Sequence, residues 1–349
     1  MRVVIVGATG NVGTSLIRNL LDDDRVTSIL GMARRRPAWR PDRTEWVTAD
    51  ITTDDITPHL HSADAVVHLG WLFQPTHDPV ATWRTNVMGG IRVFRCAADA
   101  EVPVLVYASS VGAYSPGPRG RRVAEDWPAH GWPAAAYTRE KAYLERYLDG
   151  FEAEHPGMRV VRLRPAFSFK REAASEQRRL FAGPLLPNRL VDSALIPVLP
   201  GPADLTFQAV HTDDVAEAYR QALLRDVRGA FNIAAEPPLD LAQLAGLLGA
   251  RPVRTPSGPL RGLLAAAWRM HLVPAAPELF DAVLRLPLMD TGRARQELGW
   301  SPRHDALDAV REFLDGLRDG AGMDTPPLSA ATGGRGRVRE FATGVGRRP

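Results

Sequence analysis

The sequence predicts an α/β fold in which helices cover both faces of a doubly wound parallel sheet, with a smaller C-terminal lobe attached. Three observations lead to this prediction. Short apolar runs rich in valine and isoleucine alternate with segments of helical spacing, as expected for buried parallel strands and their crossover helices. The first of these runs ends in a glycine-rich turn. With 349 residues, of which 45% are hydrophobic, the chain can also bury a large core.

The strands are expected where apolar runs are short and bounded by turn residues. The first run, Val3–Val6, is β-branched and directly precedes the glycine-rich turn. Further strands are expected at residues 28–32, 46–47, 65–69, 104–107 and 160–163, and strand signal returns at 207–211 and 230–233. Helices are expected at 15–21, 82–100, 135–155, 239–248, 260–270 and 306–317, where apolar residues recur every three or four positions.

The chain divides into three parts by composition. Residues 1–165, together with the strand returns near 205–235, form the predicted sheet domain. Residues 166–204 and 236–319 are more often interrupted by proline and glycine, which indicates a smaller lobe interleaved with the sheet. Residues 320–349 are rich in glycine, arginine, threonine and proline and poor in apolar side chains, so we expect a disordered tail.

The composition excludes several classes of protein. A single cysteine, Cys96, leaves no internal disulfide framework and no cysteine-rich metal centre, which fits a reducing cytoplasm. No run of about 18 apolar residues is present to span a bilayer, and Met1-Arg2 leads directly into an apolar strand rather than a secretion signal. We therefore expect a cytoplasmic protein without a membrane partner, and we expect no metal site.

The net excess of positive charge lies at the C-terminal end of the chain. The formal net charge is +3, which could suggest a nucleic-acid partner. Residues 335–349, however, hold five arginines and one glutamate, a net of +4, so the rest of the chain carries −1. We therefore expect no nucleic-acid binding. Of the 43 basic residues only Lys141 and Lys170 are lysines, so a lysine in a patterned position is more informative than an arginine.

The turn after the first strand has the spacing of a dinucleotide-binding turn. It consists of Gly7, Ala8, Thr9, Gly10, Asn11, Val12 and Gly13. Glycines at these positions let the backbone approach a pyrophosphate, which the N-terminus of the following helix stabilises. The alternative is an ordinary tight turn. Because strand, spacing and helix all occur in the order that the mechanism needs, dinucleotide binding is favoured.

Two later segments bear on which dinucleotide would bind. An acidic residue after the second strand would bind an adenosine ribose, whereas a basic residue would accept a 2′-phosphate. Here Arg34 follows that strand, which favours NADP over NAD, although an exposed run of arginines is the alternative. Asp50 and Ile51 follow the third strand, where a carboxylate could accept a hydrogen bond from adenine; an exposed turn aspartate is equally consistent with the sequence.

A tyrosine, a lysine and a serine form the candidate catalytic group. Tyr137 and Lys141 are four residues apart, which places both side chains on one face of a helix. A neighbouring cation favours the phenolate and would let a tyrosine act as acid or base near neutral pH. Ser110 follows the strand at 104–108, at the edge of the sheet where such folds hold their ligands. A surface pair and a serine helix cap are the alternatives.

With these residues in place, the chain resembles the extended short-chain dehydrogenases/reductases of the NAD(P)-dependent epimerase/dehydratase group. The resemblance runs from Val3 to about Leu317. It is carried by Gly7–Gly13, Asp50-Ile51, His68–Gly70, Asn86–Gly89, Ser109-Ser110 with Tyr114, Tyr137 and Lys141, Arg164-Pro165, His211–Ala216, Phe231–Ile233 and Leu298–Pro302.

The resemblance implies a Rossmann-type cofactor domain, a substrate-binding C-terminal lobe and hydride transfer with a nicotinamide cofactor. Tyr137 would be the acid/base, Lys141 would bind the nicotinamide ribose and lower the pKa of Tyr137, and Ser110 would polarise the substrate oxygen. The cofactor-binding residues implied are Gly7, Thr9, Gly10, Asn11, Val12, Gly13, Arg34, Asp50, Ile51, Leu69, Gly70, Asn86, Tyr137, Lys141, Pro165 and Phe167. His211 would be structural, and family members commonly form homodimers.

Some positions depart from the family's nucleotide-sugar enzymes. Phe207 stands where those enzymes usually carry an arginine that contacts the nucleotide diphosphate, and Trp71 replaces a small residue after His68–Gly70. An apolar ring cannot bind a diphosphate. We therefore expect Trp71, Ser110 and Phe207 to contact a small, partly apolar substrate, although Arg178, Arg179 and Arg189 could rebuild an anion site.

Three functions remain open from the sequence. The first is an NAD(P)-dependent oxidoreductase that acts on a carbonyl or secondary alcohol. The second is an epimerase or dehydratase of a (nucleotide-)sugar that keeps NAD tightly bound. The third is a non-catalytic protein that senses the cofactor, which the intact Ser110, Tyr137 and Lys141 disfavour.

Overall fold

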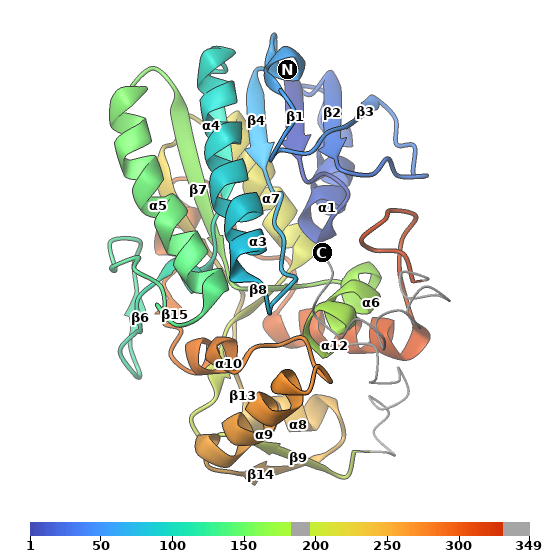
Figure 1. Ribbon diagram of the computed structural model, residues 1–349, viewed down its shortest axis with the longest axis vertical. Helices are drawn as coiled ribbons and strands as arrows, with labels where there is room; N and C mark the ends of the chain where they lie inside the picture. The colour runs from blue at the N-terminus through green and yellow to red at the C-terminus, as the bar shows by residue number, and fades with distance from the viewer. Residues whose placement is uncertain (183–195, 331–349) are drawn as a thin grey trace.

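A seven-stranded parallel sheet forms the centre of the computed structural model, which describes residues 1–182 and 196–330 (Figure 1). The predicted α/β fold class is confirmed. The strand order is β12-β7-β5-β4-β1-β2-β3. The bounds are β1 Arg2–Val6, β2 Ser28–Ala33, β3 Thr44–Thr48, β4 Ala65–His68, β5 Val104–Ala108, β7 Arg159–Pro165 and β12 Gly229–Ile233. The order reverses between β1 and β4, so the segments after these two strands border the crevice where such sheets bind ligands.

Helices cover both faces of this sheet. Strand side chains alternate in direction, so Val3 and Ile5 of β1 join one apolar cluster while Val4 and Val6 join the other. Helices α1 (Asn11–Leu21) and α7 (Thr212–Leu224) pack on the first face, and α4 (Gly89–Asp99) and α5 (Ala136–Glu154) pack on the second. Among the helices of the described ranges, none combines the length and apolar character that a bilayer-spanning segment needs.

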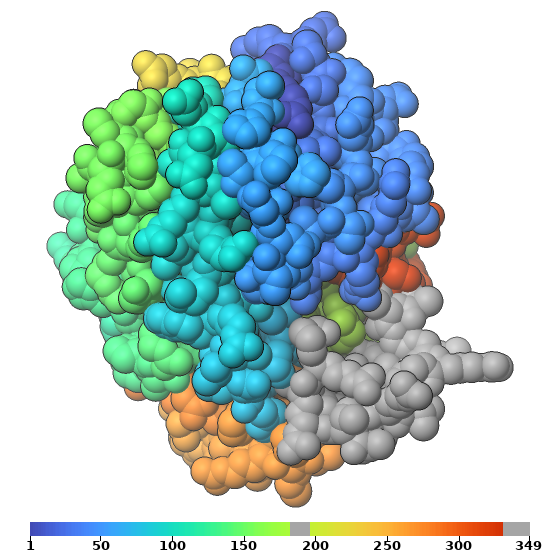
Figure 2. All heavy atoms as spheres, turned by 45° about the horizontal axis from the view of Figure 1, so that its top comes forward, coloured from blue at the N-terminus to red at the C-terminus, as the bar shows by residue number. Residues whose placement is uncertain are grey.

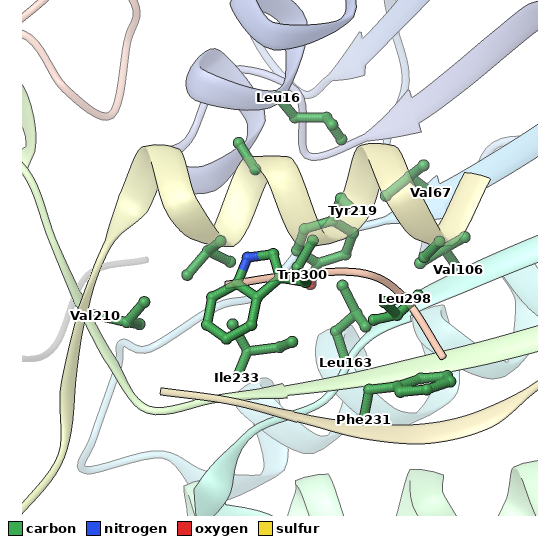
Figure 3. Packing of buried hydrophobic residues seen from close by; sticks show 14 of the residues in the cluster. Leu16, Val67, Val106, Leu163, Val210, Tyr219, Phe231, Ile233, Leu298 and Trp300 are labelled. Carbon is green, nitrogen blue, oxygen red and sulfur yellow. The ribbon is translucent and has the colours of Figure 1, made fainter. Parts of the chain in front are cut away.

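The C-terminal part of the chain returns to complete the first cluster. Figure 3 shows Leu298 and Trp300 packed among side chains of the sheet and of α7, including Tyr219. The indole of Trp300 is 1% exposed, and its Nε1 donates to the backbone oxygen of Asp214 at 2.7 Å. Burial of so large a side chain stabilises the fold by about 3 kcal/mol. The apolar cluster of the sheet therefore includes residues from the segment 236–319, which the sequence assigns to the smaller lobe.

Three predicted elements are divided in the structure. The predicted helix at 82–100 consists of α3 (Pro79–Trp83), a π-helical turn (Arg84–Met88) and α4. The predicted strand at 207–211 is split into β10 (Thr206–Phe207), which pairs with β13, and β11 (Ala209–His211), which pairs with β8, and the Gln208 side chain between them binds the backbone of Met289. The predicted helix at 239–248 begins as β13 (Leu239–Asp240) and continues as α8 (Leu241–Leu247).

The smaller lobe lies at the carboxyl end of the sheet strands, at the bottom of Figure 1. Outside the central sheet, the two-stranded pairs are β8 with β11, β9 with β14, β10 with β13, and β6 with β15. The remaining bounds are α2 Thr57–Leu60, β6 Arg122–Val123, β8 Phe167–Phe169, α6 Ala174–Gln177, β9 Val198–Gly201, β14 Arg251–Arg254, α9 Ser257–Arg269, α10 Pro277–Val283, β15 Leu288–Met289, α11 Gly292–Gln296 and α12 Ala306–Asp319. Arg189 lies outside the described residues.

Residues 321–330, which we call the C-terminal strap, lie within the described residues and pack on the rest of the chain, although their composition predicts a disordered tail from residue 320. Leu328 is fully buried and Thr325 is 2% exposed. The strap folds on itself through a Met323 N to Leu328 O hydrogen bond of 3.0 Å. It lies beside the N-terminal segments in Figures 1 and 2. Residues 331–349 lie outside the described residues.

Candidate active site

The turn between β1 and α1 is built by glycines with different roles. Gly7 has φ +85°, and a Cβ there would lie 2.5 Å from the nitrogen of Gly70, so the turns after β1 and β4 touch. A Cβ on Gly13 would lie 2.6 Å from the oxygen of Ala8, which shows that the start of α1 packs closely on the preceding turn. A Cβ on Gly10 would meet only the oxygen of Gly7, at 3.6 Å. Packing within the protein therefore does not require a glycine at position 10. Close approach of a phosphate to the backbone would require one.

The N-terminus of α1 is open to an anion. Its N-cap is Gly10, which makes no side-chain cap hydrogen bond, and its first turn contains no acidic residue. Free N–H groups and the positive end of the helix dipole together favour a phosphate. The Asn11 side chain does not fill this position, because it donates to the backbone oxygen of Ser168 and accepts from the Thr212 hydroxyl. The chain at this turn fits a dinucleotide pyrophosphate.

The other predicted cofactor contacts border the same edge of the sheet. Asp50 follows β3 and accepts hydrogen bonds from the backbone and hydroxyl of Thr52, at 2.9 and 2.7 Å. Leu69 and Gly70 follow β4 directly. Arg34 is exposed, next to the end of β2. Further sequence-predicted contacts are Thr9, Val12, Ile51, Pro165 and Phe167.

An arginine cluster forms beside the end of β2. Burial lowers the pKa of Arg35, and the charges of Arg34 and Arg179 lower it further. Arg179 belongs to the smaller lobe, so the two lobes both contribute positive charge at this position. The sequence suggested Arg179 as part of an anion site but did not indicate that its charge acts on Arg35.

The structure brings Ser110, Tyr137 and Lys141 together. Tyr137 and Lys141 lie in the first turns of α5, and Ser110 lies just beyond β5. The Ser110 hydroxyl is hydrogen-bonded to the phenol of Tyr137 and accepts from the backbone of Gly112 at 3.0 Å. A Cβ on Gly112 would lie 2.8 Å from the Tyr137 ring, so this glycine, which sequence reasoning missed, makes room for the phenol.

The electrostatics of Tyr137 differ from the expectation. Burial raises the pKa of Tyr137 to about 12; the Ser110 hydrogen bond opposes this shift, and the charge of Glu140 adds to it. Phe73 stacks on the phenol at 5.3 Å between ring centroids, and Trp71 contacts it edge-on at 5.6 Å. The predicted lowering of this pKa by Lys141 is not found in this structure. Tyr137 is therefore protonated at neutral pH.

Lys141 is held away from the phenol by two other partners. Its Nζ donates to the backbone oxygen of Ala108 at 2.6 Å and lies 3.5 Å from the ring centroid of Trp71, but 6.0 Å from that of Tyr137. Burial lowers the pKa of Lys141 to about 7, against the charges of Glu140 and Glu145. A cation that is partly neutral and that already has two partners stabilises a phenolate only weakly.

Asn86 fixes the segment that follows β4. Its side chain accepts from the backbone of Leu72 at 2.7 Å and donates to the oxygen of the same residue at 2.9 Å. It also donates to Glu140 at 2.7 Å, and Thr82 donates to the same carboxylate at 2.6 Å. The π-helical turn widens the backbone at Asn86, as such turns often do at functional sites. Sequence reasoning found Asn86 but missed Glu140 and Thr82.

A second buried network lies behind the catalytic group. Glu145 binds Arg164 through two hydrogen bonds of 2.9 Å and also accepts from the hydroxyl of Ser109. Arg164 donates to the phenol of Tyr114 at 2.8 Å. Hydrogen bonds and the charges of Arg164 and Arg162 outweigh burial and lower the pKa of Glu145 to about 2. The two neighbouring serines thus have different partners: Ser109 binds Glu145 of α5, whereas Ser110 faces Tyr137.

A cavity of about 330 Å³ opens beside Tyr137. Its walls come from the segment after β4, the start of α5, and α9 and α10 of the smaller lobe. Aromatic and other apolar side chains dominate it, including Trp71, Phe73, Phe181, Trp268 and Leu279. Its charged lining residues among those described are Arg139, Glu140 and Glu278. Sequence reasoning found Trp71 but missed the rings from the smaller lobe, which lie far away along the chain.

Phe207 lies apart from this cavity. It contacts Phe167 edge-on at 5.3 Å, and the two rings line a separate space of about 10 Å³. His211 has a structural environment: its Nδ1 accepts from the backbone of Asp213, and its Nε2 binds Glu312 of α12 at 3.1 Å. In residues 1–182 and 196–330 there is no group of three or more side chains suited to hold a metal ion.

Comparisons with known proteins agree with this geometry. Residues 3–234 match the model of the NAD dependent epimerase/dehydratase family. The chain is 26% identical over 326 residues to an uncharacterized protein of Mycobacterium tuberculosis, covering 93% of this chain and 31% of that protein. It thus spans about a third of the length of that relative.

Two further proteins are similar over nearly their whole length. A UDP-glucose 4-epimerase of Mycolicibacterium smegmatis is 26% identical over 339 residues, covering 91% of this chain and 99% of that protein. The crystal structure of a Thermus thermophilus UDP-glucose 4-epimerase in complex with NAD superposes with a TM-score of 0.68 at 21% identity. It covers 91% of this chain and 99% of that chain, so the fold is shared.

Proposed function

The chain belongs to the NAD-dependent epimerase/dehydratase family, and within it we propose an NAD(P)-dependent oxidoreductase of the extended short-chain type. Its substrate is a small, partly apolar molecule with a carbonyl or secondary alcohol. The observation that carries this proposal is the aromatic cavity beside Tyr137. Aromatic and apolar walls with a few polar groups are suited to a partly apolar ligand.

The charges of the cavity disfavour a nucleotide sugar. Glu140 and Glu278 give two carboxylates against the single cation of Arg139 among the described lining residues. A diphosphate needs cationic or N–H donors, so this lining would repel it.

The chemistry follows from the protonation state of Tyr137. A phenol whose pKa is about 12 holds its proton at neutral pH and can donate it to the oxygen of a carbonyl being reduced. Ser110, hydrogen-bonded to that phenol, would hold the same oxygen. When bound, the nicotinamide cofactor supplies the hydride. We propose that the glycine turn holds its pyrophosphate, and that Asp50 and Ile51 border the adenine.

This function predicts that Tyr137→Phe lowers the reduction rate by about 10²- to 10⁴-fold, because the proton donor is lost. The measurement is NADPH oxidation with a panel of ketones that carry aromatic or aliphatic groups. Tyr143→Phe is the matched control, since Tyr143 is 38% exposed on the same helix. If no ketone in the panel is reduced at a rate that depends on Tyr137, the result would contradict the proposal and favour the non-catalytic, cofactor-sensing role.

The alternative function is an epimerase or dehydratase of a (nucleotide-)sugar, which the similarity to a UDP-glucose 4-epimerase favours. Such an enzyme reoxidises its own cofactor and keeps NAD bound, whereas a reductase must release it. Denaturing the purified protein and assaying the released nucleotide separates the two. One NAD per chain would count heavily against the reductase, and conversion of a nucleotide sugar without added cofactor would decide for the alternative.

We propose NADP as the preferred cofactor. Arg34 and Arg35, with Arg179 near them, supply positive charge where a 2′-phosphate would lie, and no carboxylate follows β2 directly. We expect Arg34→Asp to weaken NADP binding at least tenfold and to leave NAD binding within about threefold, since a charge-assisted contact contributes roughly 1.5–3 kcal/mol. Titrations of both cofactors measure this. Equal affinities of the wild-type protein for the two would contradict the preference.

We also propose a cytoplasmic homodimer that binds neither nucleic acid nor membranes. The pairing surface would be the outer side of α4 and α5, by analogy with the family. Tyr143 and the neighbouring Met88 are exposed there, at 38% and 52%. Light scattering of the purified chain measures the mass in solution, and a monomer at micromolar concentration would contradict the homodimer.

A further inference from the structure

Lys170, the second lysine of the chain, lies buried against the helix that follows the glycine turn. It directly follows β8 and is 1% exposed. Its Nζ donates to the backbone oxygen of Asn11 at 2.8 Å and to the hydroxyls of Thr14 and Ser15 at 2.7 and 3.0 Å. All three acceptors belong to the beginning of α1. The ammonium therefore lies against the first turns of this helix, from its protein side.

The charge of Lys170 is not matched by a direct ion pair. No carboxylate among the described residues lies within 4.0 Å of its Nζ, and its three hydrogen-bond acceptors are neutral. The charged groups that face it are Glu172 and Glu176, which follow it in sequence, Asp213 of α7 and Arg18 of α1. Of these, Glu172 is paired with Arg18 at 2.9 Å.

A buried cation without a counterion is costly. Burial accordingly lowers the pKa of Lys170 to about 8. Lysines are scarce in this chain, and an arginine is too long and too planar to donate to three oxygens grouped around one point. The three oxygens therefore fit a compact ammonium group. Because the charge of this group reduces the stability of the fold, its presence indicates that the charge has a function.

The open N-terminus of α1 is the nearest place for a compensating anion. This N-terminus has no side-chain cap and no acidic residue in its first turn, and Lys170 contacts the same part of the helix through its three hydrogen bonds. We propose that Lys170 is an electrostatic positioning residue for the pyrophosphate of the dinucleotide, acting through the first turn of α1 and coupling cofactor binding to pH. This inference rests on the proposed position of the cofactor at the glycine turn.

The direction of the pH effect follows from the charges. A bound pyrophosphate favours the charged form of Lys170, so binding draws a proton from solvent when the free protein is partly deprotonated at this residue. The affinity should be highest below pH 7, where the lysine is charged in both states. It should fall as the pH rises from 7 to 9, and the proton uptake should be largest near pH 8.

The test is calorimetric titration of the full chain with NADP⁺ and with NAD⁺ between pH 7 and 9, in two buffers of different ionisation enthalpy. These titrations give both Kd and the number of protons taken up. We expect Lys170→Met to weaken binding at pH 7 on the order of tenfold, as expected for a charge near a helix N-terminus, and to abolish its share of the proton uptake near pH 8. Lys170→Gln, which keeps a hydrogen-bond donor but removes the charge, should weaken binding and reduce the proton uptake to the same extent as Lys170→Met.

Arg251→Met is the control, because it removes an exposed cation from β14 of the smaller lobe, away from the charges that face Lys170, and it should change Kd less than threefold. Melting temperatures verify that each variant is folded. Wild-type protein whose Kd and proton count do not vary between pH 7 and 9 would overturn the inference even if every variant misfolded. Wild-type-like binding by Lys170→Met would also overturn it. Failure of the wild-type protein to bind either dinucleotide would instead refute the proposed function, and this inference with it.

Discussion

Tyr137 and Lys141 lie four residues apart on α5 but in different environments. The phenol is enclosed by Phe73 and Trp71, whereas the ammonium donates to a backbone oxygen and faces the indole of Trp71. Burial disfavours the charged form of both groups, so it raises one pKa to about 12 and lowers the other to about 7. Both side chains are therefore mainly or partly neutral near pH 7, which suits proton donation by the tyrosine.

Lys141→Met tests whether this lysine is kept for function at the expense of stability. We expect the reduction rate to fall at least about 10²-fold and the melting temperature at pH 7 to rise by roughly 2–4 °C. The unfolded lysine is charged below about pH 10.5 but the folded one only below about pH 7, so folding must discharge or desolvate it. The advantage of the methionine should thus be largest at and below pH 7 and shrink toward pH 10.

Thermal unfolding at several pH values, measured alongside activity, checks this prediction. Arg139→Met is a suitable control, because Arg139 lies on the same helix and is only partly buried. It should lower stability slightly or leave it unchanged. A Lys141→Met protein that is both inactive and less stable than the wild type at pH 7 would show that Lys141 has mainly a structural role.

Among the elements, α5 organises the site. Its first turns carry Lys141 and Tyr137, of which Tyr137 lines the cavity. Glu140 and Glu145 on the same helix bind Asn86 of the π-helical turn and Arg164. One rigid helix thus positions the catalytic group relative to both β4 and β7. Substitutions that disturb it would displace several functional groups at once.

The C-terminal strap connects two walls of the proposed cofactor site. Thr325 donates to the backbone oxygen of Thr9 in the glycine turn at 2.8 Å, and Trp39, in the loop after β2, donates to the oxygen of Asp324 at 3.1 Å. An adenosine ribose bound in this fold lies between these two segments. The strap therefore ties together the parts of the chain that would contact it.

Leu328→Ala should destabilise the protein by about 2–5 kcal/mol, because it leaves a cavity at a fully buried position. Denaturant unfolding measures the change. Leu263→Ala provides the same substitution at a side chain that is 71% exposed, and it should change stability by less than about 0.5 kcal/mol. Equal effects of the two substitutions would show that the strap does not pack in solution as described.

At the scale of the whole molecule, the two lobes share their structural elements. The chain leaves the sheet after β7, builds part of the smaller lobe, and returns as β11, α7 and β12. His211 then binds Glu312 of α12, and Asp214 accepts from the backbone and ring of His304. The cavity beside Tyr137 is closed by α9 and α10 of the smaller lobe, so neither lobe forms it alone.

The sequence alone determined the parallel sheet, the glycine turn and the grouping of Ser110, Tyr137 and Lys141. These features are local: strands and helices follow from periodicity over a few residues, and Tyr137 and Lys141 share a helix face because they are four positions apart. The spacing to Tyr114 favours Ser110 over Ser109; in the structure Ser110 contacts Tyr137 and Ser109 contacts Glu145, and the catalytic role of Ser110 stays a prediction.

Only the tertiary structure decided what surrounds these residues. Burial set the pKa of Tyr137, opposite in direction to the effect expected from its neighbour Lys141. Trp268 and Phe181 reach the cavity from distant positions, Phe207 turns away from it, and Leu328 orders a segment that its composition marked as disordered. Burial and contact between distant residues depend on how the whole chain packs, and no short sequence pattern records them.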